Sequence, residues 1–453
     1  MLEQILNNQK QYFDSNITKD IEFRKKQLKR LQKAIINYMD DIYDALYQDL
    51  SKSKQEAYTT EISIVLSEIG LALKNIDKWT KKNKKSTPFY LLPSKSYTIH
   101  EPYGSVFILS PWNYPFQLTL VPLVEAITAG NTAIIEVSKE AVFTKALLKK
   151  IIEEIYEDKY IYLIDDSTSY EEMLNQNYDY IFFTGSTRVA KIVMKAASKN
   201  LTPVTLELGG KNPCFVDNVK DIKLCAKRIA WGKSLNCGQT CIAPDYIVIS
   251  QDIKDIFIKE LYLQLTTMFP DMTNNHDYPK LINENHFKRI ENLINKQHDY
   301  IGGEINKDNL KIEMTIIKDC NFDNEVMKDE IFGPIIPIIS YKNIDEILPT
   351  IKSLGKPLAC YVFSDNQSYI DKIFNSLSFG GGCVNDVIMH IVNANLPFGG
   401  VGNSGMGQYH GYNGFKTFSH EKSIIVSSRK VDLSLKYAPF KNKNLKLLSK
   451  LIN

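Results

Sequence analysis

Long hydrophobic runs are missing from this chain of 453 residues. No stretch of about eighteen apolar residues occurs, so no transmembrane helix is predicted. The amino terminus, MLEQILNNQKQYFDSN, has acidic and amide residues where a secretory signal needs an uninterrupted apolar stretch. These absences favour a cytoplasmic protein.

An excess of charge of one sign is also missing. Lys and Arg number 55 against 52 Asp and Glu, a formal net charge of +3. A chain so close to neutral gives no reason to expect a nucleic acid partner. The sequence also contains no internal repeat, no low-complexity linker and no good copy of the GxGxxG motif.

Cysteine is scarce and scattered. The seven cysteines show no paired metal-ligand spacing, so no metal site is predicted, and their odd number does not suggest a disulfide framework. We interpret them as reduced thiols, one of which could be chemically active. They are Cys214, Cys225, Cys237, Cys241, Cys320, Cys360 and Cys383.

The residues that are present have the balance of a globular protein. Of the chain, 44% is hydrophobic and 24% is charged. Its length is too great for a single hydrophobic core, so two or three domains are expected.

Helical periodicity dominates the first eighty residues. Apolar residues recur every three or four positions over Phe23–Leu50, which predicts one long amphipathic helix, and a second helix is predicted over Ile62–Trp79. Charge and proline then interrupt the pattern, which favours an extended excursion over 81–100.

From Val106 onward, short apolar segments alternate with helical ones. Alternating units of this length predict a parallel, doubly wound α/β sheet, which binds ligands beyond the carboxyl ends of its strands. The expected strands are Val106–Leu109, Thr132–Val137, Tyr160–Ile164 and Tyr180–Phe183, and the expected helices are Leu118–Ala129, Ala141–Tyr156 and Thr187–Lys199.

A second α/β block is expected from about Gly209 to residue 393. It contains a strand at Tyr246–Ile249, a long helix from Lys254 and an apolar segment at Phe332–Ile339. The Gly-rich stretch 397–407 and the basic tail after Lys430 would form a third, smaller unit.

Cys241 is a candidate nucleophile in the segment NCGQTCIAP, residues 236–244. A thiolate is a strong nucleophile, and Gly238 would let the backbone turn tightly and present the thiol to a cleft. Cys237 lies four residues earlier and is equally eligible from the residues alone. A buried, inert thiol is the alternative for either one.

Two further polar residues lie where strands are predicted to end. Glu207 stands alone in the strand-like VTLELGGK and could act as a general base or form a structural ion pair. Asn113, in the loop SPWNYP, carries an N–H₂ group suited to stabilising an oxyanion, although Asn is also common in turns. The loop TGSTRVA at 184–190 would offer backbone N–H groups to a pyrophosphate at a helix amino end.

Taken together, these segments resemble the aldehyde dehydrogenase superfamily. PWNYP, AGNTAII (129–135), FTGST (183–187), LELGGK (206–211), GQTCIAPD (238–245), EIFGP (330–334) and LPFGGVGNSGMG (396–407) stand in the family's order. The match is best to the class 3, or fatty-aldehyde, branch and extends to about Lys430.

The resemblance implies two doubly wound parallel α/β domains plus a small oligomerisation unit. Residues 1–80 and 100–207 would bind the cofactor, and 208–393 would carry the nucleophile. Residues 81–99 and 394–453 would form the bridging segments and the carboxyl-terminal tail. The resemblance also implies a homodimer in which strands of the third unit cross between subunits.

The family's roles transfer onto matching residues. Cys241 becomes the nucleophile, Glu207 the base that activates water, and Asn113 the oxyanion donor together with the Cys241 backbone N–H. The implied reaction oxidises an aldehyde to its acid through a thioester, with hydride transfer to NAD(P), and the branch favours medium- or long-chain and aromatic aldehydes. The implied cofactor contacts are Gly185, Ser186 and Thr187 at the pyrophosphate and Glu330 and Phe332 at the nicotinamide ribose and ring.

Two positions depart from the family pattern. Glu136 stands where the family has a Lys that binds the adenosine ribose, and Lys139 lies nearby. A carboxylate accepts a hydrogen bond from a ribose hydroxyl but repels a 2′-phosphate, which favours NAD over NADP.

The tail 430–453 lacks the long apolar anchor of membrane-bound relatives. Its apolar residues at helical spacing (Leu445, Leu448 and Ile452) allow a basic amphipathic helix that packs on a partner subunit or touches a membrane.

Three other functions remain open from the sequence. A CoA-acylating enzyme would pass the thioester to CoA, but Glu207 argues for hydrolysis. Thioesterase or esterase activity at Cys241 would leave Glu330 and Phe332 unexplained. A non-catalytic, cofactor-binding descendant of the fold would bind cofactor without turnover.

Overall fold

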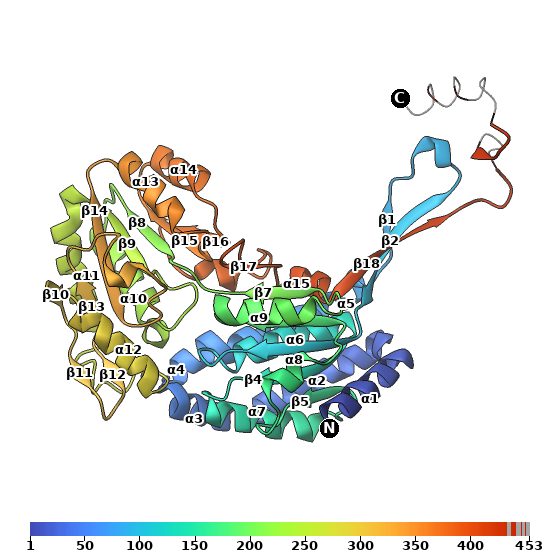
Figure 1. Cartoon of the computed structure of the whole chain (residues 1–453), viewed down its shortest axis with the longest axis horizontal. Coiled ribbons are helices and arrows are strands. Elements are labelled where there is room, and N and C mark those ends of the chain that lie inside the picture. Colours follow the sequence, from blue (N-terminus) through green and yellow to red (C-terminus); the bar gives the residue numbers. More distant parts are fainter. Residues whose placement is uncertain (433–435, 441–444, 446–448, 450–453) are drawn as a thin grey trace.

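The computed structural model of this chain describes all residues except 433–435, 441–444, 446–448 and 450–453. It has two α/β lobes and an arm that projects from one of them (Figure 1). The helix predicted over the tail falls mostly on residues outside those described. Within the described residues, no helix is long and apolar enough to cross a membrane.

The first lobe is built on a six-stranded sheet with the order β17-β7-β6-β3-β4-β5. All neighbours in it are parallel except β17, which runs antiparallel to β7. Its strands are β3 (Ser105–Ser110), β4 (Thr132–Val137), β5 (Ile161–Leu163), β6 (Tyr180–Thr184), β7 (Val204–Glu207) and β17 (Gly405–Met406).

Helices cover both faces of this sheet, which explains why its strands are continuously apolar. Along β3, Val106 and Ile108 pack into one hydrophobic cluster, and Phe107 and Leu109 pack into another. The first cluster is shared with α2 (Ile21–Asn37), α3 (Met39–Leu50), α5 (Ser63–Trp79), α6 (Gln117–Ala129) and α7 (Val142–Ile155). The second is shared with α1 (Leu2–Asp14), α8 (Tyr170–Leu174) and α9 (Thr187–Ala197).

The single helix predicted over Phe23–Leu50 is wrong. The chain forms two helices, α2 and α3, which meet at Tyr38, whose φ of −96° and ψ of 15° are not helical. No glycine or proline marks this break. The reason for it is tertiary, because α2 packs on α5 and α6 whereas α3 packs on α7. The Tyr38 hydroxyl also donates a hydrogen bond to the carboxylate of Glu154 on α7.

The second lobe is built on a seven-stranded sheet with the order β10-β13-β14-β9-β8-β15-β16. Only the β10–β13 pair is antiparallel. Its strands are β8 (Pro213–Val216), β9 (Tyr246–Ser250), β10 (Tyr300–Ile301), β13 (Thr315–Ile317), β14 (Ile335–Tyr341), β15 (Ala359–Phe363) and β16 (Gly381–Val384). The accompanying helices are α10 (Ile222–Ser234), α11 (Lys254–Met268), α12 (Glu284–Asn295), α13 (Ile344–Ser353) and α14 (Gln367–Ser376), and β11 (Ile305–Asn306) pairs with β12 (Lys311–Ile312).

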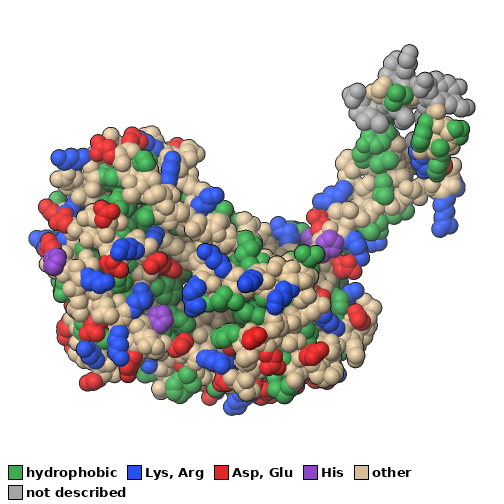
Figure 2. Space-filling view, viewed as in Figure 1, with side chains coloured by type: hydrophobic (Ala, Val, Ile, Leu, Met, Phe, Trp, Pro, Cys, Tyr) green, Lys and Arg blue, Asp and Glu red, His purple; other side chains and the backbone are tan. Residues whose placement is uncertain are grey.

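The arm is a three-stranded antiparallel sheet of β1 (Asn83–Lys85), β2 (Lys95–Pro102) and β18 (Ser419–Val426). Hydrophobic side chains lie along the arm toward its end (Figure 2), and exposed Phe89 and Leu92 belong to the turn between β1 and β2. The excursion predicted over 81–100 is therefore part of this arm, joined by β18 from the far end of the chain.

Both main sheets confirm the predicted fold class of doubly wound, largely parallel α/β units. The division of the chain into a cofactor domain, a nucleophile domain and bridging segments stays a prediction. The sheets add one detail to it: β17, from the segment assigned to the third unit, completes the edge of the first lobe's sheet.

Candidate functional site

The loop at 110–115 leaves the carboxyl end of β3, where a doubly wound sheet opens toward its ligands. Asn113 is buried, and its Nδ2 donates to the carbonyl of Gln239 at 3.1 Å. The neighbouring Tyr114 hydroxyl and Thr240 Oγ1 lie 2.6 Å apart. Two consecutive residues of this loop therefore bond to the two residues directly ahead of Cys241.

Cys241 follows a tight left-handed turn. Asn236, Cys237 and Gly238 have φ values of 50°, 55° and 74°, a backbone conformation that costs free energy in residues other than glycine. The N–H of Asn236 is held by Glu56 Oε1 at 2.7 Å. This turn lets the chain leave α10 and present the thiol of Cys241 to an open space rather than to the core.

Cys237 points the other way. Its side chain is fully buried and its Sγ lies 3.4 Å from the hydroxyl of Tyr278. Burial raises the pKa of this thiol to about 12. Cys237 lines neither of the two cavities that meet at Cys241, so the structure favours Cys241 as the accessible thiol.

Glu207 is the last residue of β7 and is almost fully buried. Neither of its carboxylate oxygens has a hydrogen-bond partner among the residues that the structure describes. Burial raises the pKa of this carboxyl well above its ordinary value. A buried carboxyl without a protein partner costs free energy, which points to a partner supplied from outside the chain.

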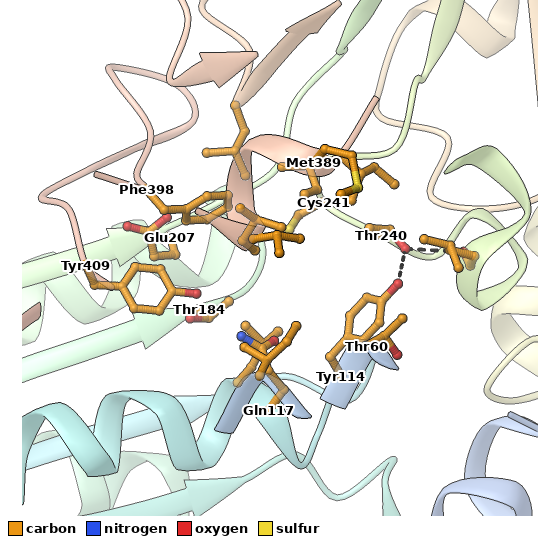
Figure 3. Close-up of a pocket in the computed structure, with 18 of the residues that line it drawn as sticks. Thr60, Tyr114, Gln117, Thr184, Glu207, Thr240, Cys241, Met389, Phe398 and Tyr409 are labelled. Carbon is orange, nitrogen blue, oxygen red and sulfur yellow. Dashed lines mark hydrogen bonds between the residues drawn. The ribbon is translucent and has the colours of Figure 1, made fainter. Parts of the chain in front are cut away.

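The first cavity, here the Tyr409 cavity, has a volume of about 270 Å³. Cys241 and Glu207 line it opposite Tyr114 and Gln117, and Tyr409 lies on the same side of the view as Glu207 (Figure 3). Most of the remaining wall is apolar and comes from Ile64, Leu118, Trp231, Leu235, Ile242, Leu358, Ile388, Met389, Ile391, Val392 and Phe398.

The second cavity, here the Phe332 cavity, has a volume of about 340 Å³. Its wall includes Trp112, whose ring meets that of Phe332 edge-on at 5.4 Å between centroids. Asn113, Gly185, Ser186, Arg289 and Glu330 also line it. The two cavities share five lining residues, namely Leu118, Thr184, Glu207, Leu208 and Cys241.

Three acidic groups are crowded at this junction. Burial, together with smaller contributions from the carboxylates of Glu330 and Glu207, raises the pKa of the Cys241 thiol to about 12. Burial likewise raises the pKa of Glu330 to about 8. Near neutral pH the thiol therefore holds its proton in the protein alone, and forming a thiolate requires a proton acceptor or a nearby positive charge.

The predicted cofactor residues divide between two places. Gly185, Ser186, Glu330 and Phe332 line the Phe332 cavity, and Ser186 also caps α9 by accepting the Val189 N–H at 3.4 Å. Thr187 is the first residue of α9 but does not line the cavity, and its hydroxyl donates to the carbonyl of Asn403 at 3.5 Å.

Glu136 lies apart from both cavities. It belongs to β4, is buried, and its carboxylate lies 3.3 Å from Lys145 Nζ. Burial raises the pKa of this carboxyl to about 7, although Lys145 opposes the shift. Lys145 also pairs with Asp166 at 2.8 Å. The carboxylate of Glu136 is thus paired with Lys145. Its contact with a ribose stays a prediction.

The sequence interpretation missed two residues of the Phe332 cavity. His286 and Arg289, both on α12, line it, and Arg289 donates to the carbonyl of Phe332 at 3.2 Å. The ring of His286 lies 4.8 Å from that of Trp112. The available signal was a histidine and an arginine one turn apart on a strongly amphipathic helix.

The residues of the Phe332 cavity fit a nicotinamide dinucleotide. The amino end of α9, with Gly185 and Ser186, offers backbone N–H groups and a positive helix end to phosphate, and Arg289 adds a cation. Trp112 and Phe332 offer aromatic surface to a flat ring. Such a group would reach Cys241 at the junction of the two cavities.

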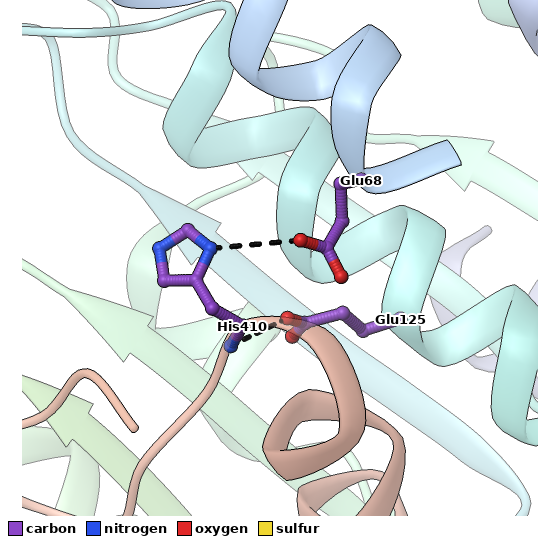
Figure 4. Close-up of side chains that lie close together, drawn as sticks. All are labelled: Glu68, Glu125 and His410. Atoms are coloured by element: carbon purple, nitrogen blue, oxygen red, sulfur yellow. Dashed lines mark hydrogen bonds and ion pairs between the residues drawn. The ribbon is translucent and has the colours of Figure 1, made fainter. Parts of the chain in front are cut away.

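A second buried acidic cluster is formed by Glu68, Glu125 and His410 (Figure 4). Glu125 accepts the His410 N–H at 2.7 Å, and Glu68 accepts the Gly411 N–H at 2.8 Å. The His410 Nδ1 lies 3.7 Å from Glu68. Burial and the nearby Glu68 raise the pKa of Glu125 well above its ordinary value. Because both carboxylates accept backbone N–H groups of the same segment, we interpret the cluster as a contact that holds the chain after β17 onto α5 and α6.

Comparison with known proteins identifies the class. Residues 2–424 match the aldehyde dehydrogenase family, and the chain belongs to that family. The protein is an NAD(P)-dependent aldehyde dehydrogenase that oxidises aldehydes to acids.

Individual relatives place the chain more finely within the family. It is 45% identical to the 4,4'-diaponeurosporen-aldehyde dehydrogenase of Staphylococcus aureus over 447 residues, 98% of this chain and 97% of that protein. It is 41% identical to the dimeric NADP-preferring aldehyde dehydrogenase of Mus musculus over 94% of this chain and 95% of that one.

Solved structures agree with this placement. The substrate-bound state of Staphylococcus aureus AldH has a TM-score of 0.97 with 44% identity and covers 100% of both chains. The gamma-glutamyl-gamma-aminobutyraldehyde dehydrogenase of Burkholderia cenocepacia shares the fold at a TM-score of 0.85, with 22% identity over 93% of this chain and 88% of that one.

Proposed function

We propose that Cys241, Asn113 and Glu207 carry out the oxidation of a long apolar aldehyde through a thioester. The observation that carries this proposal is the junction of the two cavities, where an accessible thiol and an unpartnered carboxyl line both. An aldehyde in the Tyr409 cavity and a nicotinamide in the Phe332 cavity would meet at Cys241.

The first step forms a carbon–sulfur bond. The Cys241 thiol gives its proton to a water molecule, and its sulfur attacks the aldehyde carbon to give a tetrahedral hemithioacetal with the negative charge on oxygen. Asn113 Nδ2 has two N–H bonds, and the carbonyl of Gln239 uses only one of them. The other N–H, together with the backbone N–H of Cys241, would stabilise the oxyanion.

A nicotinamide held in the Phe332 cavity would supply the redox chemistry as the hydride acceptor for that carbon, and Cys241 would then carry a thioester. Gly185, Ser186, Glu330 and Phe332 are the predicted residues that would hold this cofactor, and we add His286 and Arg289 to them.

The last step consumes water. Glu207, whose pKa is raised and which has no hydrogen-bond partner among the described residues, would take a proton from a water molecule that attacks the thioester carbon. The carbon–sulfur bond breaks, the acid leaves, and the thiol is restored. Transfer of the thioester to CoA instead is the second candidate reaction, and Glu207 disfavours it.

The lining of the Tyr409 cavity supports an apolar substrate. Its wall is dominated by aliphatic and aromatic side chains, and none of the described Lys or Arg residues lines it. A hydrocarbon chain would gain about 0.8 kcal/mol for each CH₂ buried there, whereas a charged aldehyde would lose its hydration without a partner. The S. aureus relative is named for a long apolar aldehyde, which agrees with this choice.

The test is steady-state reduction of the nicotinamide by purified protein, without CoA, over aldehydes of increasing chain length. We expect kcat/KM to rise with the chain length of the aldehyde. The same assay compares NAD with NADP. A rate that appears only when CoA is added would overturn hydrolysis. A preference for short, charged aldehydes would overturn the substrate class.

For the cofactor, we propose a preference for NAD. The pair of carboxylates at Glu136 and Asp166 would repel a 2′-phosphate if the adenosine end lies at the carboxyl end of β4, although Lys145 partly offsets them. In that case Glu136→Gln should lower the KM for NADP and leave that for NAD nearly unchanged. A lower KM for NADP than for NAD in the unaltered protein would contradict the preference.

We also propose a homodimer formed through the arm. Strands β18 and β16 each stand at the edge of a sheet, with one side of the backbone unpaired within the described part of the chain. Such edges pair readily with a second chain. Ile425→Glu with Val426→Glu on exposed positions of β18 should convert dimer to monomer in light scattering, and a monomeric unaltered protein would refute the proposal.

We also propose a cytoplasmic location. All seven cysteines are free thiols, as expected in a reducing compartment. Cell fractionation with compartment markers tests it, and recovery outside the cytoplasm would contradict it.

A further inference from the structure

The segment ahead of α5 contains an unusual turn. The short helix α4 (Lys54–Ala57) runs into a π-helical turn at Tyr58–Ile62 before α5 begins at Ser63. Turns of this kind carry one extra residue and are frequent at functional sites. Thr59 and Thr60 in this turn line the Tyr409 cavity, whereas Glu61 faces inward and is fully buried.

Glu61 holds the end of the loop that carries Asn113. Its Oε2 accepts the backbone N–H groups of Phe116 at 2.9 Å and Gln117 at 3.1 Å. Its Oε1 accepts from Lys52 Nζ at 2.6 Å, and the side chains of both partners are 0% exposed. One buried carboxylate therefore ties the start of α6 to the segment before α4.

Lys52 holds the middle of the same loop. Its Nζ donates to the carbonyl of Asn113 at 2.9 Å and lies 3.9 Å from the centre of the Tyr114 ring. Asn236 Nδ2 donates to the same Asn113 carbonyl at 2.7 Å. The ammonium thus touches both residues that bond to the chain ahead of Cys241.

These contacts form two continuous connections to the nucleophile. One runs from Lys52 through the Asn113 backbone and its Nδ2 to the carbonyl of Gln239. The other runs from Lys52 over the Tyr114 ring to Thr240. Gln239 and Thr240 immediately precede Cys241.

We propose that Lys52 and Glu61 are positioning residues for the oxyanion site. They fix the backbone of Asn113 so that its unused Nδ2 hydrogen faces the oxygen of the adduct on Cys241. This proposal rests on the roles given above to Cys241 and Asn113. It adds two residues that touch neither substrate nor cofactor and lie at least fifty positions before Asn113 in the sequence.

Stability alone does not account for this pair. Removing two charges from water is costly, and replacing a buried ion pair by apolar side chains of similar volume is often neutral or even stabilising. The carboxylate of Glu61 and the ammonium of Lys52 instead make four hydrogen bonds: two from backbone N–H groups, one to a backbone carbonyl and one between themselves. Such a network fixes geometry, which is what an oxyanion donor requires.

The test variant carries Lys52→Met together with Glu61→Gln. Gln at position 61 keeps one oxygen for the two N–H groups, and both charges of the Lys52–Glu61 pair are removed together. We expect kcat for aldehyde oxidation to fall about 10- to 100-fold with little change in KM, because misplacement of one oxyanion donor acts on the transition state. Hydrolysis of p-nitrophenyl acetate, which needs Cys241 and the oxyanion site but no cofactor, should fall by the same factor.

The alkylation rate of Cys241 by iodoacetamide distinguishes positioning from general damage. That reaction displaces iodide from carbon and forms no oxyanion, so we expect its rate to stay within about twofold of the unaltered protein. A fall in alkylation parallel to the fall in ester hydrolysis, or ester hydrolysis that does not fall, would overturn the proposal.

Arg24→Met is the matched control. Arg24 is a buried cation that donates to the carbonyls of Thr18 and Thr128 in the same lobe, away from the Asn113 loop. This variant should lower the melting temperature without changing kcat. A loss of kcat equal to that of the test variant would show that any buried cation in this lobe has the same effect.

A double-mutant cycle tests whether Lys52 and Glu61 act through Asn113. In an Asn113→Ala background the test pair should cause no further loss of ester hydrolysis. Additive losses would overturn the positioning role of Lys52 and Glu61 but not the role of Asn113. Full ester hydrolysis in Asn113→Ala itself would refute the role of Asn113 and the inference with it. If the double replacement does not fold, Glu61→Gln alone should lower dehydrogenase and esterase kcat by equal, smaller factors.

Discussion

Glu61 and Glu207 are both buried carboxylates beside the Tyr409 cavity, but they differ in every contact. Glu61 has both oxygens bonded, to Lys52 and to two backbone N–H groups. Neither oxygen of Glu207 has a partner in the part of the chain that the structure describes. The comparison indicates that a satisfied buried carboxylate supports the site, whereas an unsatisfied one is available to react.

The largest expected effect follows from neutralising Glu207. Glu207→Gln should reduce steady turnover about 10²- to 10⁴-fold, because the base that activates water is lost. A single burst of reduced nicotinamide, measured by stopped-flow absorbance, should remain because acylation does not need the base. Undiminished steady turnover would show that Glu207 is not the base.

The same replacement should stabilise the fold, in contrast to a change at Glu61. The pKa of Glu207 is raised on folding, so its protonated form is favoured and stability is lost as pH rises above the unfolded pKa. Glu207→Gln should therefore raise the melting temperature at about pH 8 and leave it unchanged at about pH 4. A lower melting temperature at both pH values would place Glu207 with Glu61 as a supporting residue.

The next largest effect follows from breaking the Glu61 pair on one side. Lys52→Met alone leaves a buried carboxylate uncompensated and should lower the free energy of unfolding by about 3–5 kcal/mol. The variant that also carries Glu61→Gln should recover most of this loss in urea denaturation. Equal stability of the single and double variants would mean that Glu61 is not held as a charge.

A smaller effect concerns Glu330, the other carboxylate beside Cys241. Glu330 raises the pKa of the Cys241 thiol, so Glu330→Gln should move the pH profile of iodoacetamide alkylation to lower pH by roughly half to one unit. The direction follows because removing a nearby negative charge favours the thiolate. A profile that moves to higher pH, or does not move, would contradict the electrostatic contact.

The smallest effect is expected at Glu125, a carboxyl bonded on one oxygen only. Its Oε1 accepts the His410 N–H, and Oε2 has no partner within the described residues. Because Gln keeps that acceptor and mimics the protonated acid, Glu125→Gln should change the free energy of unfolding by less than about 1 kcal/mol. Glu125→Ala, which removes the acceptor, is the control that should cost more.

The sequence predicted the parallel strands of the first lobe closely, because a strand buried on both faces is a short, continuous apolar run. Thr132–Val137 was predicted with the observed bounds of β4. The break at Tyr38 was not predictable, since no residue there disfavours a helix. It depends on which neighbours α2 and α3 contact, and those contacts join residues far apart in the chain.

The site was predictable to a similar degree. Motif resemblance singled out Cys241, Glu207 and Asn113, and all three line the Phe332 cavity, whereas their roles stay predictions. It could not single out Lys52 or Glu61, because a lysine and a glutamate nine residues apart look like any solvated pair. Their role follows from their contacts with residues 113–117, which are far from them in the sequence. Glu136 shows the converse, since its position in the pattern suggested a ligand contact whereas its carboxylate bonds Lys145.

The π-helical turn at Tyr58–Ile62 makes the number of residues here as important as their identity. Each residue of an α-helix rotates the chain by about 100°, so removing one residue from this turn would swing everything before it by more than a quarter of a revolution. Thr59 and Thr60 would leave the cavity wall, and Lys52 would leave Asn113. Point substitutions in this segment change one contact at a time, but a single deletion would change the cavity and the oxyanion site together.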